Sequence, residues 1–292
     1  MLENQIKMPN TLILKAFLTL FVLLLTFAAP AVAGYPGNEK ETTVRILTTE
    51  GTIRIKLYNE TPRHRDNFIK LVKTGYYDST LFHRVINEFM IQGGDPDSKH
   101  AAPGQPLGNG GPDYTIPAEF RPEKLFHKKG VLAAARNGDD VNPTRASSGS
   151  QFYIVEGKKY TEADLNNVEQ RLLMQKKQEL FLKLLNQPEN AALKVKFFSF
   201  RQQQQTDSLM GIVKTMDPQV QTELLKTPPY KFSQEQRTIY ETIGGSPHLD
   251  GGYTVFGEVI EGMDVVDKIA AAKTGQADRP IADIRILKMV IE

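Results

Sequence analysis

The stretch LFHRVINEFMIQGGDP, at residues 81–96, decides which fold this chain is expected to adopt. Arg84 lies five residues before an apolar pair, Phe89 and Met90, and Gln92 leads directly into two glycines. In an ordinary half-buried strand, polar and apolar residues alternate because successive side chains point to opposite faces. This stretch instead places a permanent charge beside an apolar pair and a glycine turn. The pattern predicts a slot in which an apolar group lies next to a guanidinium.

The composition of the whole chain excludes several kinds of site. At 292 residues the chain is long enough for one large domain or two smaller ones, and 40% hydrophobic with 24% charged residues is typical of a soluble globular protein. The formal net charge of +2 gives no reason to expect a nucleic-acid surface. The sequence contains no cysteine, which excludes disulfides and thiol chemistry, and its five histidines are scattered. We therefore expect neither a metal nor any other cofactor.

The first residues have the pattern of a secretory signal peptide. Lys7 and Lys15 precede a long apolar run that ends in Ala-Val-Ala at residues 31–33. The uninterrupted apolar part is shorter than the roughly 20 residues that a membrane span needs. We expect a signal peptide at residues 1–33, a linker at 34–42, and export to a bacterial periplasm with no membrane contact in the mature form. The alternative is an inner-membrane protein anchored by an uncleaved signal segment.

Downstream of the linker, short alternating segments predict a β framework. Residues 43–57 contain two alternating apolar runs around a Glu-Gly turn, which is typical of a β-hairpin. A helix is expected to follow, with Thr61 as its N-cap, Pro62 in its first position and Gly75 at its end. Further strands are expected at residues 129–136, 149–157, 253–260 and 281–292, a helix at 262–273 and a long loop at 93–113. Many short strands, long loops and two helices favour a closed or nearly closed β-barrel.

A block of helical periodicity at residues 157–243 interrupts this framework. Its first helix is expected to place six apolar side chains on one face: Leu165, Val168, Leu172, Leu180, Phe181 and Leu184. The simplest interpretation is that these stripes pack within the block or against the barrel, and the alternative is a groove that docks a partner protein. The barrel would then consist of residues 43–156 and 244–292. We expect it to fold without the block, since a short loop can join the flanking strands.

The motifs together identify a family. In order along the chain they are LFHRVINEFMIQGGDP, GPDYTIPAEF, GVLAAAR, SGSQFYI and PHLDGGYTVFGEVIEGMDVVDKI. The chain thereby resembles the cyclophilin family of peptidyl-prolyl cis-trans isomerases. The resemblance implies a mainly β fold, a closed eight-stranded antiparallel barrel capped by two α-helices, with a surface groove that binds X-Pro segments. The helical insertion is not part of the usual family pattern.

The resemblance also implies which residues form the site. Arg84 matches the catalytic arginine, and Gln92 matches a polar residue that orients it; guanidinium suits this role because it keeps its charge and projects N–H groups in a rigid plane. The implied substrate-binding residues are His83, Phe89, Met90, Ala135, Arg136, Gln151, Tyr153, His248, Leu249 and Tyr253. Two of these depart from the family: His248 stands where many members carry tryptophan, and Tyr153 replaces a frequent phenylalanine. The Tyr153 hydroxyl needs a partner if it is buried.

The expected function is a rotamase that accelerates X-Pro rotation in exported or folding polypeptides. No bond is made or broken in that reaction, so no nucleophile or metal is required. Its substrates would be proline-containing polypeptides, and the insertion could bind a protein partner. The alternative is a chaperone or scaffold module that binds proline-containing peptides and works through the helical insertion. Arg84 favours catalysis, because binding alone does not need the donor.

Overall fold

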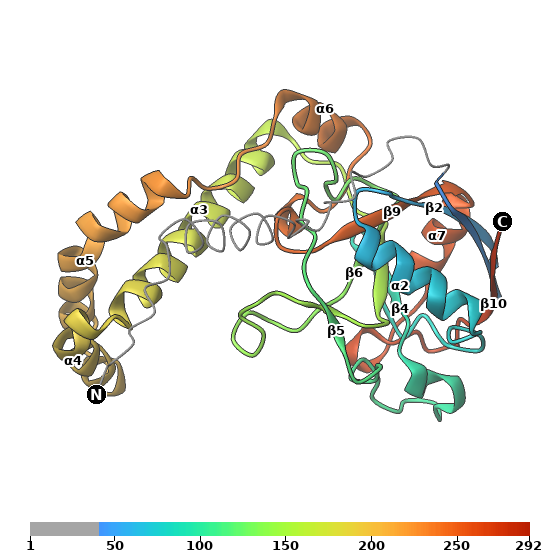
Figure 1. The fold of residues 1–292 in the computed structure, drawn as a ribbon, viewed down its shortest axis with the longest axis horizontal. Coiled ribbons are helices and arrows are strands. Elements are labelled where there is room, and N and C mark those ends of the chain that lie inside the picture. The colour runs from blue at the N-terminus through green and yellow to red at the C-terminus, as the bar shows by residue number, and fades with distance from the viewer. Residues whose placement is uncertain (1–40) are drawn as a thin grey trace, which may run out of the picture. The chain divides into compact units, whose positions relative to one another are not determined.

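The computed structural model describes residues 41–292 (Figure 1). The predicted signal peptide, and the predicted linker up to residue 40, lie outside the described residues. Eight antiparallel strands form one sheet in the order β10-β1-β2-β9-β6-β8-β4-β3. Its strands are β1 (Thr43–Thr48), β2 (Gly51–Leu57), β3 (Arg84–Ile86), β4 (Met90–Gly93), β6 (Val131–Ala134), β8 (Phe152–Val155), β9 (Val255–Glu261) and β10 (Ile286–Ile291). Two short strands, β5 (Thr115–Ile116) and β7 (Ser147–Ser148), pair separately.

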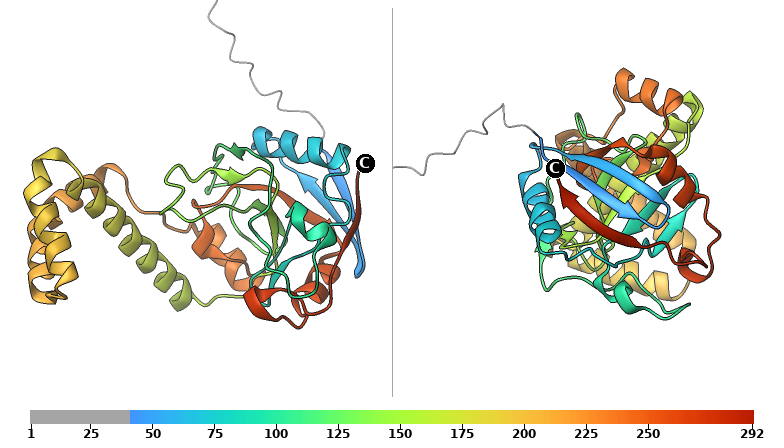
Figure 2. Two further views of the ribbon diagram at one scale, coloured as in Figure 1. Left: turned by 90° about the horizontal axis from the view of Figure 1, so that it is seen from below. Right: turned by 90° about the vertical axis from the view of Figure 1, so that its right-hand side faces the viewer.

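The eight-stranded antiparallel sheet confirms the predicted barrel architecture, but the word "closed" is too strong. The hairpin β1–β2 lies beside the C-terminal strand β10, as Figure 2 shows, and the other edge of the sheet is β3. The two edges meet through one isolated bridge between Leu81 and Arg285 and a hydrogen bond from the Phe82 N–H to the Ile284 carbonyl, at 2.9 Å. No continuous ladder of hydrogen bonds joins the two edges, because the residues that meet the β10 side lie before the first residue of β3. The barrel is therefore nearly closed.

Two helices cover the barrel, as expected. Helix α2 (Pro62–Lys73) contacts β9 and β10, and α7 (Met263–Ala270) contacts β2, β3 and β4. The inner core is fully or almost fully buried and joins both helices to the strands. Its members include Val44, Ile46, Ile53, Ile55, Leu57, Phe68, Leu132, Phe152, Ile154, Val266 and Ile269. Because each such side chain contributes about 1.5–3 kcal/mol by burial, this cluster is the main source of the barrel's stability.

The N-terminus of α2 is capped differently from the prediction. Thr61 occupies the N-cap position, but its side chain makes no capping hydrogen bond. The carboxylate of Glu119 instead accepts hydrogen bonds from the backbone N–H groups of Arg63 and His64, at 3.2 and 3.1 Å. A carboxylate suits this place because the helix dipole is positive at its N-terminus. The cap thus comes from a loop far along the chain.

The helical insertion contains α3 (Glu162–Leu185), α4 (Ala191–Gln202), α5 (Thr206–Lys226) and α6 (Gln234–Thr242). Its apolar side chains form two clusters. The root cluster joins the insertion to the barrel and consists of Phe126, Leu165, Val168, Phe232 and Tyr240. The tip cluster lies between α3 and α5 and consists of Leu180, Phe181, Leu184, Leu185, Ile212, Met216 and Val220.

The prediction that one face of α3 carries a single stripe is therefore wrong. Leu165 and Phe181 are sixteen positions apart, and at 3.6 residues per turn their side chains point about 160° apart. Each half of the helix consequently serves a different cluster. Among the described residues, no helix is both long and apolar enough to cross a membrane.

Candidate active site

One part of the sheet is apolar on both faces. Along β8, Phe152 and Ile154 point into the inner core, whereas Tyr153 points to the opposite face. That opposite face carries an outer cluster of buried side chains: Tyr58, Met90, Val131, Ala133, Tyr153, Val155 and Val255. The stretch at residues 81–96 does not alternate because its strand β4 lies in this doubly covered part of the sheet.

A cavity of about 420 Å³ lies over the outer cluster. Ten of the twelve residues predicted for the site line it: His83, Arg84, Phe89, Met90, Gln92, Ala135, Arg136, Tyr153, Leu249 and Tyr253. The strand register explains why they meet, since Arg84 pairs with Gln92 across β3 and β4, and Gln92 pairs with Tyr153 across β4 and β8. Paired residues project to the same face, so these three side chains form a row across three strands.

A chain of hydrogen bonds orients the guanidinium of Arg84. The Gln151 Nε2 donates to the backbone carbonyls of Gly108 and Gly110, at 2.9 and 2.7 Å. The Gln151 Oε1 accepts from Gln92 Nε2 at 3.0 Å, and the Gln92 Oε1 accepts from Arg84 Nη1 at 3.5 Å. Gln151 itself lines an adjoining cavity rather than the main one. The loop at residue 108 is thereby linked to the arginine through two amides.

Arg84 has a second partner that the sequence did not indicate. The Arg84 Nε donates to Asp278 Oδ2 at 3.3 Å, with both side chains close to half exposed. Asp278 belongs to a turn at residues 276–279 that lines the cavity. Ala277 and Asp278 both adopt left-handed backbone angles, with φ of 56° and 59°, which is uncommon for residues other than glycine. This turn places one carboxylate beside the arginine at the edge of the cavity.

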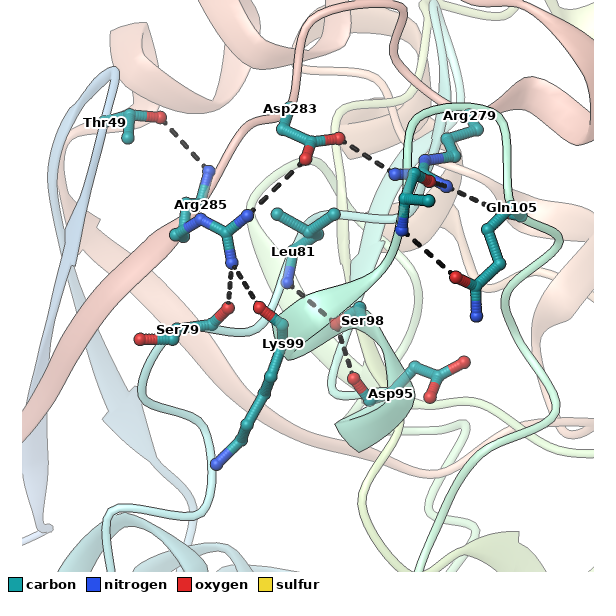
Figure 3. A network of polar contacts seen from close by, with 11 residues as sticks. Thr49, Ser79, Leu81, Asp95, Ser98, Lys99, Gln105, Arg279, Asp283 and Arg285 are labelled. Atoms are coloured by element: carbon teal, nitrogen blue, oxygen red, sulfur yellow. Dashed lines mark hydrogen bonds and ion pairs between the residues drawn. The ribbon is translucent and has the colours of Figure 1, made fainter.

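A buried arginine, Arg279, fixes the loop that forms another wall of the cavity, and Figure 3 shows the polar network around it. The Arg279 Nη1 donates to the backbone carbonyls of Ala102 and Gln105, at 3.0 and 2.6 Å. The carboxylate of Asp283 bridges Arg279 and Arg285, at 3.0 and 3.5 Å. The sequence predicted only a surface loop here. The acceptors are backbone carbonyls, which no side-chain pattern reveals.

Two further cavity residues are held in defined states. His83 is buried, neither ring nitrogen has a hydrogen-bond partner among the described residues, and burial lowers its pKa to about 4. His83 is consequently neutral at pH 7.

The guanidinium of Arg136 lies 4.5 Å from the ring centre of Tyr253, and its Nε donates to the Gly252 carbonyl at 2.7 Å. Arg136 therefore fixes the position of the Tyr253 ring.

The Tyr153 hydroxyl has the partner that its burial requires. It lies 2.9 Å from Nε2 of His127, whose Nδ1 lies 2.8 Å from Oδ1 of Asp250. The other oxygen of Asp250 accepts a hydrogen bond of 2.6 Å from the hydroxyl of Tyr240, in helix α6 of the insertion. Burial raises the pKa of Tyr153 well above its ordinary value, so the hydroxyl stays protonated. A buried polar chain thus runs from the cavity wall to the insertion.

His248 is the one predicted residue that lines neither of these cavities. Its ring centre lies 5.4 Å from that of Phe89, and the side chain faces a third, smaller cavity beside helix α3. The neighbouring Leu249 does line the main cavity. The pair formed by Phe89 and His248 therefore stands between the main cavity and the insertion.

Comparisons of the sequence with known proteins identify one family. The family model for cyclophilin type peptidyl-prolyl cis-trans isomerase/CLD matches residues 43–172 and 233–291. A Staphylococcus aureus (strain COL) protein, named as an inferred peptidyl-prolyl cis-trans isomerase, is 29% identical over 270 residues, which covers 89% of this chain and 100% of the relative. A protein of the same name from Staphylococcus saprophyticus is 31% identical over 252 residues, covering 85% of this chain and 91% of the relative.

A solved structure completes the comparison. The crystal structure of a Cryptosporidium parvum cyclophilin type peptidyl-prolyl cis-trans isomerase matches with a TM-score of 0.49 and 20% identity, covering 86% of this chain and 98% of that one. The family model alone spans well over half of the chain. This chain belongs to the cyclophilin-type peptidyl-prolyl cis-trans isomerase family.

Proposed function

We propose that the chain isomerises X-Pro bonds by binding the twisted amide more tightly than the planar one, with Arg84 as the donor. Rotation is slow because amide resonance must be broken, at a barrier of about 18–20 kcal/mol. As the bond twists, the proline nitrogen regains its lone pair and becomes a better hydrogen-bond acceptor. A donor fixed near that nitrogen stabilises the twisted state selectively. The observation that carries this proposal is Arg84 held by Gln92 at the edge of the apolar cavity.

The outer cluster also contributes to the rate acceleration, in addition to the hydrogen bond from Arg84. Phe89, Met90 and Tyr153 offer an apolar floor for the proline ring, and the cavity removes water from around the amide. One charge-assisted hydrogen bond is worth about 1.5–3 kcal/mol, which corresponds to a factor of about 10–100 in rate. Desolvation and clamping of the substrate backbone along Ala135 must therefore contribute as well. Gln92 acts by orienting Arg84.

The substitution Arg84→Ala tests this mechanism. We expect kcat/KM toward a prolyl tetrapeptide to fall about 10- to 100-fold, because the donor is lost. Arg63→Ala is the matched control, since Arg63 is exposed on α2 outside the cavity. Circular dichroism of both variants checks the fold. Equal rates for wild type and Arg84→Ala would overturn the mechanism.

The substrates we propose are polypeptides that fold after export to a bacterial periplasm. The basic and apolar pattern of residues 1–33 supports export, and the protein would meet chains that are still folding there. Mass spectrometry of the mature protein tests this, and an intact N-terminus would show that the signal is not cleaved.

A second role, binding unfolded chains through the insertion, is supported by a specific observation. Helix α4 at the tip exposes two large apolar side chains three positions apart, with Val195 72% and Phe198 47% exposed, and residues three apart share one face of a helix. Exposed apolar side chains that lie together are typical of interaction sites. If the tip binds clients, Val195→Ser with Phe198→Ser will weaken suppression of aggregation of a denatured protein while isomerase activity is retained. Unchanged suppression would remove this second role.

A further inference from the structure

A smaller cavity lies where the insertion meets the barrel. Its volume is about 260 Å³, and its lining includes three cations, Lys158, Lys159 and Arg171, together with His248. The two lysines lie a few residues after the end of strand β8, whereas Arg171 belongs to helix α3. Barrel and insertion therefore both contribute to it.

This basic cavity is a direct neighbour of the main one. The Gly157 N–H, immediately before Lys158, donates to the Phe89 carbonyl at 3.0 Å. The Phe89 and His248 rings are 5.4 Å apart, with Phe89 lining the main cavity and His248 lining the basic one. An extended chain advances about 3.3 Å per residue. A peptide with its proline over Met90 therefore reaches the basic cavity within a few residues.

Among residues 41–292, no carboxylate lies within ion-pair distance of the three cations. Arg171 Nε donates to the Asn167 carbonyl at 3.4 Å, and Lys158 Nζ lies 5.9 Å from the Tyr160 ring centre. None of the three makes an ion pair with any residue in the described part of the chain.

Two carboxylates lie close to the basic cavity, and they offset only part of its positive charge. Asp164 lines it, but its carboxylate accepts hydrogen bonds from the backbone N–H and the hydroxyl of Thr161, at 2.9 and 2.7 Å, as the cap of α3. Glu88 lies near Tyr160 and is exposed to solvent. The positive charges outnumber the negative ones, and the cations remain available to a ligand.

We propose that the basic cavity is a substrate subsite that selects X-Pro segments carrying an acidic side chain within about three residues of the proline. This rests on the proposed function, because the proline must occupy the main cavity for the acidic side chain to reach the cations. Lysine and arginine bind carboxylates through charge-assisted hydrogen bonds. Because the cations are exposed, the preference will be moderate and will weaken as salt screens the charges. The insertion then helps to choose the substrate.

Paired peptides test the subsite. One pair carries Glu or Gln two residues after the proline, and a second pair carries Glu or Gln two residues before it; exchange NMR measures kcat/KM for each. For wild type we expect one pair to favour Glu by about 3- to 10-fold at low ionic strength, falling below about 2-fold at 0.5 M NaCl. The triple variant Lys158→Gln, Lys159→Gln, Arg171→Gln should bring that Glu-to-Gln ratio close to one.

A charge-matched control locates the effect. The triple variant Lys196→Gln, Arg201→Gln, Lys214→Gln removes the same net charge from exposed positions on α4 and α5 and should keep the wild-type ratio. Equal rates for Glu and Gln peptides with wild type, or loss of the ratio in the control as well, would overturn the subsite. Absence of any isomerisation by wild type would instead overturn the proposed function.

Discussion

The barrel and the tip of the insertion are built on opposite principles. The barrel encloses one continuous core whose aliphatic side chains are almost all inaccessible to solvent, and it carries a second apolar cluster on its outer face. At the tip, α4 has no fully buried residue, and its cluster depends on contacts between α3 and α5. The root cluster lies between these extremes, because it shares Phe126 with the barrel. The insertion is therefore structurally part of the enzyme at its root and independent of it at its tip.

The largest expected effect is on thermal stability, and it distinguishes the root of the insertion from its tip. Deleting residues 158–243 removes Tyr240 and Phe232 and exposes Phe126, so we expect loss of soluble folded protein or a fall in Tm of about 10 °C or more. Replacing only residues 176–226 by a flexible linker that spans from α3 to α6 should change Tm by less than about 3 °C. Thermal denaturation followed by circular dichroism measures both.

These deletions also decide between two expectations. The sequence predicted a barrel that folds without the block, whereas the shared root cluster predicts that it does not. A stable, active protein lacking residues 158–243 would show that the root cluster is dispensable. Severe destabilisation on removing the tip alone would show that tip and root are not independent.

A smaller expected effect is the pH dependence of stability, which should differ between the barrel and the insertion. The pKa of His83 is about 4 in the folded barrel, below its ordinary value of 6.5, so the unfolded chain binds the proton first as the pH falls. The stability that this provides is complete above pH 6.5 and is lost between pH 6.5 and about 4, by about 2–3 kcal/mol. The insertion contains no histidine. His83→Phe should therefore reduce the pH dependence of barrel unfolding.

Denaturant titrations at pH 4.5, 5.5 and 7 measure this difference. His100→Gln is the control, because His100 is exposed. A wild type and a His83→Phe variant with parallel pH profiles would contradict the assignment of His83 as a buried neutral group.

The smallest effect tests the polar chain that links the two regions. Tyr240→Phe and Tyr153→Phe each remove one buried hydroxyl, and each should cost about 1 kcal/mol in free energy of unfolding. Because both hydroxyls act on the His127–Asp250 pair, the double variant should deviate from additivity by about 0.5 kcal/mol or more. Tyr160→Phe serves as the control, since its hydroxyl makes no hydrogen bond to any residue from 41 to 292. Strictly additive changes in the free energy of unfolding would mean that this chain of hydrogen bonds does not couple the insertion to the cavity.

The sequence predicted six of the eight barrel strands and both capping helices, because strand and helix periodicity depends on neighbours within a few positions. It did not predict β3 and β4 as strands, because residues 81–96 do not alternate. Ten residues of the main cavity were predicted from the resemblance of short motifs to the family. The sequence also predicted the helices of the insertion from their period. It did not predict that α3 would serve two clusters, because a small drift from an exact repeat accumulates over a long helix.

The tertiary structure alone decided the contacts between distant segments. Asp278 reaches Arg84 across 194 positions, Arg279 holds a loop through its backbone carbonyls, and His248 faces the insertion instead of the main cavity. None of these contacts has a local sequence signature, since each depends on how two elements that are distant in the sequence pack against each other. Local patterning specifies which elements form and which faces they bury, and only packing specifies which polar groups then meet.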